Sequence, residues 1–168
     1  LEEVVGIRAS GLRDLADVND RIDPVDTDVR VVTGLGDTVY HTLMGRPSVL
    51  TPGERLDRAF LEAYDGTLCI SPRYERLVTA VVGTAALDGV EFVYPPATRT
   101  EEAAIADAGL GVYLTVTGST ARDHGLVIGE QLFPSETVLM RNTAESHPTA
   151  REAVALFDGV ITESKLTV

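Results

Sequence analysis

The chain has 168 residues, enough for one domain or two small lobes with a substantial buried core. Hydrophobic residues make up 44% of it and charged residues 24%, a globular composition that excludes a disordered or fibrous protein. The net charge of −12 argues against a nucleic-acid partner, because binding a polyanion requires a basic face. No apolar run approaches the roughly 18 to 20 residues that cross a bilayer, so we expect a cytoplasmic protein without a membrane partner.

Strands and helices are expected to alternate in the first part of the chain, from the period of the apolar residues and from the turn residues. The expected elements are strand 4–8, a helix capped by Ser10, strand 28–32, helix 37–44, and a helix that starts at Pro52 and ends before Asp65.

From residue 67 the alternation becomes regular, which is typical of βαβ units. The expected elements are strand 67–71, helix 74–86, strand 90–94, helix 100–106, strand 109–116, a short helix near Ala121, strands 126–133 and 137–140, and a helix capped by Ser146. We expect an α/β protein with two lobes and a cleft between them. Lobe I comprises residues 1–65 and 143–168, and lobe II comprises residues 66–142.

The strongest candidate site is Thr117-Gly118-Ser119-Thr120, here called the Thr117 loop, where a predicted strand ends and a helix begins. At such a position backbone N–H groups and the positive end of the helix dipole face an anion. Glycine lets the backbone turn closely around a ligand, and three hydroxyls can donate hydrogen bonds to phosphate oxygens. The loop therefore predicts a phosphate site, with an ordinary Ser/Thr helix cap as the alternative.

A second candidate turn comes after strand 28–32 and adds Thr33, Gly34 and Asp37 as substrate ligands. Loops at the carboxyl ends of strands line ligand crevices in α/β sheets. The turn is not a dinucleotide fingerprint, because Val39 stands where the third glycine is needed.

Other chemistry-bearing residues give weaker signals. The chain has three histidines, His41, His124 and His147. No two of them have the i, i+4 spacing of a helical metal pair, so we expect each at the surface or at a helix end. The single cysteine, Cys69, lies in an apolar run and is expected to be a buried structural thiol. Glu101 and Glu102 could hold Mg²⁺ near a bound phosphate, although the helix dipole explains acidic residues at a helix start equally well.

Several segments, taken in order, resemble the catalytic chain of ATP phosphoribosyltransferase. They are Arg8-Ala9-Ser10-Gly11-Leu12 for the family's Arg-Ala-x-Asp-Ile, residues 28–37 for its Asp-Leu-Gly-Ile-Thr-Gly-x-Asp strand and turn, residues 70–74 where the family has Ala-Thr-Lys-Tyr-Pro, residues 106–108 for its Ala-Asp-Ala, residues 116–120 for its Thr-Gly-x-Thr loop, and then residues 125–126 and 135–142. The Thr-Gly-x-Thr stretch and the segments after it are the most specific part of the resemblance.

The resemblance implies a two-lobed, periplasmic-binding-protein-like (type II) fold with mixed sheets. It also implies a glycosyltransferase that moves phosphoribosyl from phosphoribosyl pyrophosphate (PRPP) to N1 of ATP, with release of pyrophosphate, in the first step of histidine biosynthesis. Mg²⁺ would accompany the pyrophosphate, and the Thr117 loop would hold the 5′-phosphate. Arg8 and Arg73 would be cationic ligands for pyrophosphate or ATP phosphates. The catalytic residues are not assigned, and a homo-oligomer is left open.

Two positions depart from the family pattern. Tyr113 stands where an ungapped alignment places an acidic residue able to meet the ribose hydroxyls, and Gly11 replaces the acidic residue of the first motif. The family's N-terminal strand with its basic glycine loop has no match in these 168 residues. These departures leave open a non-catalytic binding domain of the same fold that recognises a small phosphorylated or anionic ligand.

Overall fold

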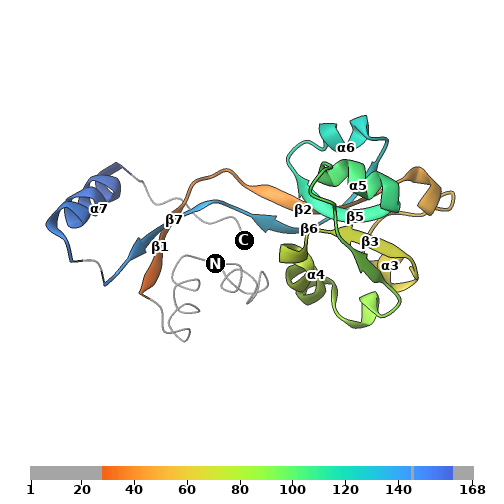
Figure 1. The fold of residues 1–168 in the computed structure, drawn as a ribbon, viewed down its shortest axis with the longest axis horizontal. Helices are drawn as coiled ribbons and strands as arrows, with labels where there is room; N and C mark the ends of the chain where they lie inside the picture. The colour runs from red at the N-terminus through yellow and green to blue at the C-terminus, as the bar shows by residue number, and fades with distance from the viewer. Residues whose placement is uncertain (1–27, 145, 161–168) are drawn as a thin grey trace. The chain divides into compact units, whose positions relative to one another are not determined.

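The computed structural model of the protein describes residues 28–144 and 146–160. They belong to two compact units, Leu1–Thr38 with Glu136–Val168 and Val39–Ser135, and each unit is described by itself (Figure 1). The expected strand 4–8 and the candidate ligand Arg8 lie outside the described residues. The two compact units differ in their boundaries from the two lobes expected from the sequence, and the lobes stay a prediction.

The unit Val39–Ser135 is built on a mixed five-stranded sheet with the strand order β4-β3-β5-β2-β6. Its strands are β2 (Val39–Gly45), β3 (Thr67–Ile70), β4 (Glu91–Val93), β5 (Leu110–Thr115) and β6 (Val127–Ser135). β3 pairs in parallel with β4 and β5, whereas β2 lies antiparallel between β5 and β6. This mixed sheet confirms the α/β class that the sequence predicts.

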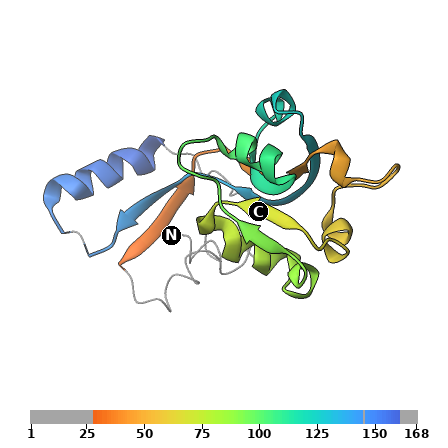
Figure 2. The same cartoon turned by 45° about the vertical axis from the view of Figure 1, so that its right-hand side comes forward.

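Helices cover both faces of the sheet, with α5 and α6 on one face and α4 on the other (Figures 1 and 2). The helices are α3 (Arg58–Glu62), α4 (Glu75–Val82), α5 (Glu101–Ala108) and α6 (Ser119–Asp123), with 3-10 turns η2 (Pro47–Val49), η3 (Pro72–Tyr74) and η4 (Ala85–Leu87). Gly111 in β5 allows α5 to pack closely, because a Cβ there would lie 2.4 Å from the Ile105 side chain. The core between α5, α6 and the sheet includes Cys69, which is buried and free as predicted.

The strands and helices predicted after residue 66 are confirmed, with shifts of a few residues at their ends. The prediction that Ser146 caps the last helix is wrong, because this helix starts at Pro148 and the ring nitrogen Nδ1 of His147 accepts the hydrogen bond from the Thr149 backbone N–H at 3.3 Å.

The helix predicted to start at Pro52 starts instead at Arg58, where the Asp57 carboxylate accepts a hydrogen bond from the backbone N–H of Phe60 at 3.0 Å. This side-chain cap fixes the start of α3, because it satisfies a first-turn N–H group that has no partner within the helix.

The prediction of a helix over residues 37–44 is wrong, because most of this segment forms β2. Leu43 and Met44 are both fully buried, on opposite faces of the strand. A central strand buried on both faces has a continuous apolar run instead of an alternating one, so the period of its apolar residues is ambiguous. The β-branched and aromatic residues of the run, such as Val39 and Tyr40, are the signal that favours a strand.

The prediction of a surface or helix-end position is also wrong for His41, whose side chain is only 1% exposed. Its ring stacks on Phe133 with centroids 4.2 Å apart and meets Tyr74 edge-on at 4.4 Å. Neither ring nitrogen has a hydrogen-bond partner in the structure. Burial therefore disfavours the charged imidazolium and lowers the pKa of His41 to about 4. The predicted exposure of His124 and His147 is confirmed.

The other unit contains a two-stranded antiparallel ribbon of β1 (Val29–Gly34) and β7 (Val138–Asn142), followed by α7 (Pro148–Val160). Asp37 closes one end of the ribbon, where its carboxylate accepts hydrogen bonds from the Thr137 backbone N–H at 2.9 Å and from the Thr137 hydroxyl at 2.6 Å. Both bonds stabilise the charged form, so they lower the pKa of Asp37 below its ordinary value of 3.8.

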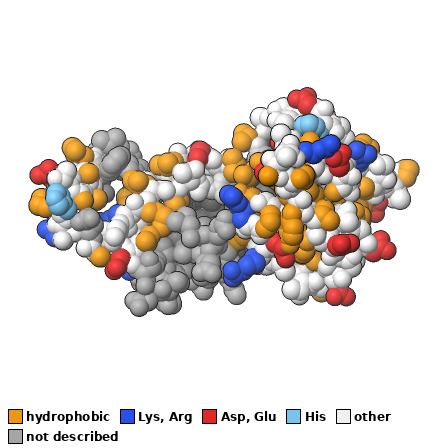
Figure 3. Space-filling view, viewed as in Figure 1, with side chains coloured by type: hydrophobic (Ala, Val, Ile, Leu, Met, Phe, Trp, Pro, Cys, Tyr) orange, Lys and Arg blue, Asp and Glu red, His pale blue; other side chains and the backbone are white. Residues whose placement is uncertain are grey.

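The described arginines form no large basic patch on the face that Figure 3 shows, where they lie in separate small groups. Within the described ranges, no helix combines the length and the apolar composition needed to cross a bilayer.

The buried His41 predicts a pH-dependent stability. Its pKa is about 4 in the folded state and near 6.5 in the unfolded chain, so the unfolded state binds the extra proton between these values. The free energy of unfolding should fall as the pH drops from 6.5 towards 4, by up to about 3 kcal/mol from this group. Urea denaturation at several pH values measures the change. His41→Phe should remove this pH-dependent fall in the free energy of unfolding, whereas His124→Gln, at an exposed histidine, should retain it. Equal pH profiles for His41→Phe and the unchanged protein would contradict the prediction.

The Asp37–Thr137 contact predicts a measurable carboxyl titration. Thr137→Val removes the hydroxyl donor, so the pKa of Asp37 should rise towards 3.8, as followed by NMR of the side-chain carboxyl carbon. Thr143→Val is the matched control, because the Thr143 hydroxyl donates to the carbonyl of Asp28 instead. An Asp37 pKa unmoved by Thr137→Val would show that the hydroxyl does not stabilise this carboxylate.

Candidate functional site

Gly118 determines the geometry of the Thr117 loop. It has φ 70°, a left-handed conformation, and it is the N-cap residue of α6. A Cβ at this position would be strained and would lie 3.0 Å from the Ile128 side chain, so the turn requires glycine. Gly118 has no side chain to cap α6, and the Thr117 hydroxyl oxygen instead accepts a long hydrogen bond, 3.4 Å, from the backbone N–H of Ser119, the first residue of the helix.

The side chains of Thr117, Ser119 and Thr120 are exposed, and all three residues line one pocket. The hydroxyl oxygens of Thr117 and Ser119 lie 3.2 Å apart, and the Thr120 side chain is exposed as well. Arg122 stabilises the turn, because its guanidinium donates a hydrogen bond to the Thr117 carbonyl at 2.9 Å. The loop borders an open pocket of about 190 Å³, lined by Met44, Glu102, Leu114, Thr115, Val116, Thr117, Gly118, Ser119, Thr120 and Ala121.

Glu101 and Glu102 lie at the same edge of the sheet as the loop. The chain leaves β4 at its carboxyl end and enters α5 at Glu101, and β4 and β5 run in the same direction. Carboxyl ends of parallel strands share one edge, so the start of α5 and the loop after β5 are brought together. Glu102 lines the pocket of the loop. The sequence suggested both glutamates for their position at a helix start but did not place Glu102 against the Thr117 loop.

Tyr113 in β5 lies close to both glutamates. Burial raises the pKa of the Tyr113 phenol, and the negative charges of Glu101 and Glu102 together with a hydrogen bond to Glu101 raise it further. The residue that replaces the family's acidic position therefore contacts a carboxylate supplied by α5. Sequence reasoning missed this contact, because it joins a strand and a helix through packing.

The other candidate ligands lie in two different places. Arg73 is exposed in η3, directly after β3, and β3 is the parallel neighbour of β5. Arg73 and the Thr117 loop therefore come after strands that end at the same edge. Thr33, Gly34 and Asp37 belong to the other compact unit, where Thr33 is buried and donates its hydroxyl to the Gly34 carbonyl at 3.1 Å. Their role as substrate ligands stays a prediction.

The carboxylates at this edge fit a magnesium ion only in part. Among the described residues, no group of three or more His, Cys, Asp or Glu side chains could hold a metal. Mg²⁺ commonly takes one or two protein carboxylates and completes its shell with water and substrate phosphates. Glu101 and Glu102 would supply the one or two carboxylates of that arrangement, and their role as metal ligands stays a prediction.

Comparisons with solved structures and with protein families find matches to this chain. A comparison with curated proteins finds no match. Among solved structures, the chain is similar to a chain of the ATP phosphoribosyl transferase (HisG:HisZ) complex from Thermotoga maritima, with 16% identity and a TM-score of 0.50, over 83% of this chain and 64% of that chain. The likeness shows the fold alone, and this chain spans less than two thirds of that relative.

The family comparison covers more of the chain. The family described as halobacterial ATP phosphoribosyltransferase matches residues 1–168. The match includes the Thr117 loop, the start of α5 and Tyr113, and it extends over both compact units. The protein therefore belongs to the halobacterial ATP phosphoribosyltransferase family.

Proposed function

We propose that this protein binds PRPP and ATP and transfers the phosphoribosyl group to N1 of ATP with release of pyrophosphate, the first step of histidine biosynthesis. The Thr117 loop is the observation that carries the proposal. It combines a glycine-dependent turn, the backbone N–H groups at the start of α6 and three exposed hydroxyls beside an open pocket. This is the set of donors that a phosphate monoester needs.

The loop would hold the 5′-phosphate of PRPP. The hydroxyls of Thr117, Ser119 and Thr120 would donate hydrogen bonds to the phosphate oxygens. The first backbone N–H groups of α6 would donate to the same phosphate. The helix has only five residues, so the fixed N–H groups matter more here than a long helix dipole. The loop carries no lysine or carboxylate of its own, which leaves the phosphate dianion to be bound by hydrogen bonds.

Glu102 would act on the ribose side of the same ligand. Its carboxylate lines the pocket, within the space that a group attached to the 5′-phosphate would enter. A carboxylate accepts hydrogen bonds from two neighbouring ribose hydroxyls, and it stabilises positive charge that develops at the ribose carbon as the pyrophosphate leaves. Mg²⁺, when bound, would neutralise pyrophosphate charge and help this group to depart.

Arg73 is the candidate cation for the leaving group. It is exposed at the edge where the Thr117 loop lies, and it forms no ion pair among the described residues. In the transfer, the bond between the ribose carbon and a pyrophosphate oxygen breaks while a bond to N1 of ATP forms. Placing two anionic substrates together is the main task, because charge repulsion opposes their approach.

The two-lobed, periplasmic-binding-protein-like form of the fold is part of this proposal. The division into two compact units and the likeness to the Thermotoga maritima chain support it. The substrates, ATP and PRPP, would place the protein in the cytoplasm. A partner chain, as in the complex of that relative, or a homo-oligomer is compatible with the proposal.

Removal of the loop hydroxyls should weaken substrate binding. Hydrogen bonds to charged groups contribute roughly 1.5 to 3 kcal/mol each, so Thr117→Ala with Thr120→Ala should weaken PRPP binding by a few kcal/mol. Calorimetric titration with PRPP and Mg²⁺, with and without ATP, measures this, and a pyrophosphate-release assay measures turnover. Thr98→Ala, an exposed threonine in a loop of the same unit, is the matched control.

Each outcome of this titration has a definite meaning. Binding with pyrophosphate release establishes the transferase, and binding without release favours a non-catalytic domain that recognises a phosphorylated ligand. If the double variant binds PRPP as tightly as the unchanged protein, the Thr117 loop is not part of the site.

Glu102→Gln should distinguish binding of the ribose group from binding of the 5′-phosphate. Loss of one charge-assisted contact should weaken Mg²⁺-dependent PRPP binding about tenfold or more, with little effect on inorganic phosphate at the loop. Glu91→Gln, an exposed glutamate in β4, is the control of equal charge change. PRPP affinity that is equal in Glu102→Gln and Glu91→Gln would remove Glu102 from the site.

A further inference from the structure

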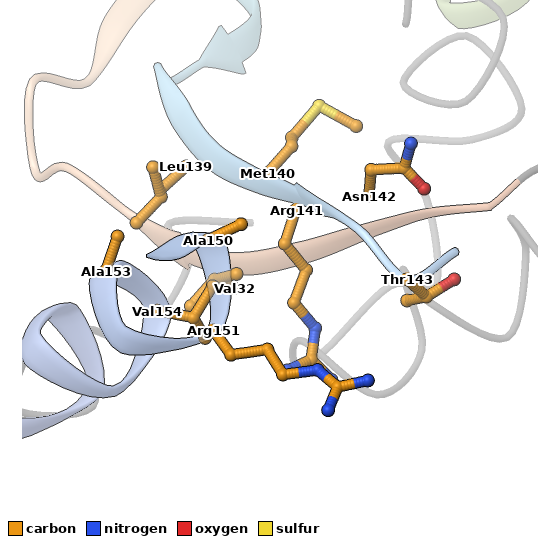
Figure 4. A pocket seen from close by; sticks show the side chains of 10 residues that line it. All are labelled: Val32, Leu139, Met140, Arg141, Asn142, Thr143, Ala150, Arg151, Ala153 and Val154. Atoms are coloured by element: carbon orange, nitrogen blue, oxygen red, sulfur yellow. The ribbon is translucent and has the colours of Figure 1, made fainter. Parts of the chain in front are cut away.

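A second cavity lies in the unit that contains α7, between this helix and the ribbon of β1 and β7 (Figure 4). It measures about 500 Å³ and is lined by Val32, Leu139, Met140, Arg141, Asn142, Thr143, Ala150, Arg151, Ala153 and Val154. It shares no residue with the Thr117 loop pocket. The cavity is within the range of about 300 to 1,000 Å³ that is typical of small-molecule sites.

Two arginines from different elements line this cavity. Arg141 extends from β7 and Arg151 from the start of α7, and in the view of Figure 4 both side chains point to the same side of the cavity. Among the described residues, neither guanidinium has an ion-pair or hydrogen-bond partner. The chain has 26 acidic and only 14 basic residues, and no carboxylate within residues 28–144 and 146–160 forms an ion pair with Arg141 or Arg151.

The surrounding structure increases the positive potential at this point. Two guanidinium groups repel each other, and a bound anion removes that repulsion. Arg151 also lies near the N-terminus of α7, a helix of 13 residues with no acidic residue in its first turn. The positive end of a helix dipole disfavours a cation there and favours an anion. Both effects point to a negatively charged ligand.

The rest of the cavity lining is mostly apolar, which favours a ligand that carries an apolar body next to its anionic group. Val32 and Leu139 come from the ribbon, and Ala150 and Val154 come from the helix, where they are half-buried. Asn142 also lines the cavity, but its side chain leaves β7 on the opposite side from Arg141 (Figure 4). A cavity with apolar walls and two charged donors at one side matches a ligand that has an apolar body and one anionic group.

We propose that this cavity binds a small organic anion, with its phosphate or carboxylate group between Arg141 and Arg151 and its apolar body against Leu139, Ala150 and Val154. Each guanidinium can donate two parallel hydrogen bonds to such a group. The site is additional to the proposed transferase site and does not depend on it. It gives the unit with α7 a ligand of its own.

The test uses phenyl phosphate and benzoate, which carry the two anionic groups on the same apolar body. Binding is followed by amide NMR shifts in the Thr117→Ala, Thr120→Ala background, so that the Thr117 loop does not contribute. We expect saturable shifts at Leu139, Ala150 and Val154, and weaker binding of inorganic phosphate and of uncharged benzyl alcohol. The tighter of phenyl phosphate and benzoate identifies the preferred anionic group.

Arg141→Gln and Arg151→Gln should each weaken binding about tenfold or more, since each removes charge-assisted hydrogen bonds. Arg46→Gln, an exposed arginine of the other unit with the same charge change, should leave binding unchanged. Both arginines are exposed, so the variants should fold. The proposal is overturned if neither probe saturates, if the three arginine variants bind equally well, or if inorganic phosphate alone binds as tightly as phenyl phosphate.

Discussion

The larger unit depends on β2, a strand buried on both faces and paired on both edges. Leu43 and Met44 fill the core on opposite sides of the sheet, and β2 joins β5 to β6. The buried hydroxyl oxygens of Thr42 and Thr115 lie 2.6 Å apart, which ties the middle of β2 to the last residue of β5. Because β5 is fixed at its end, the Thr117 loop begins at a defined point.

The sequence predicted best those parts whose signals are local. The βαβ block after residue 66 has turn residues between short apolar runs, and Gly118 with its neighbouring hydroxyls marks a turn after a strand. β2 and the buried state of His41 were missed, because burial on both faces removes the alternation that identifies a strand. Whether a histidine faces solvent or an aromatic pair such as Tyr74 and Phe133 is decided by tertiary packing.

The candidate site shows the same division. The Thr117 loop could be found from residue types and position, whereas the approach of Glu102 depends on how α5 lies across β5. That approach requires Gly111, since a side chain there would collide with Ile105 of α5. A glycine within a strand is visible in the sequence, but its partner across the interface is not. The position of a carboxylate near the loop is therefore a property of the packed structure.

This packing bears on the departure at Tyr113. A carboxylate can reach the carboxyl edge of an α/β sheet either from a strand or from the first turn of a helix that begins at that edge. In this protein the strand supplies a phenol, and α5 supplies Glu101 and Glu102 beside it. Glu101 is close to the Tyr113 phenol, and Glu102 is on the pocket wall. Under the proposed function, the helix would carry the negative charge of the ribose side, so that replacement of the strand carboxylate would move the acidic group of the site instead of removing it.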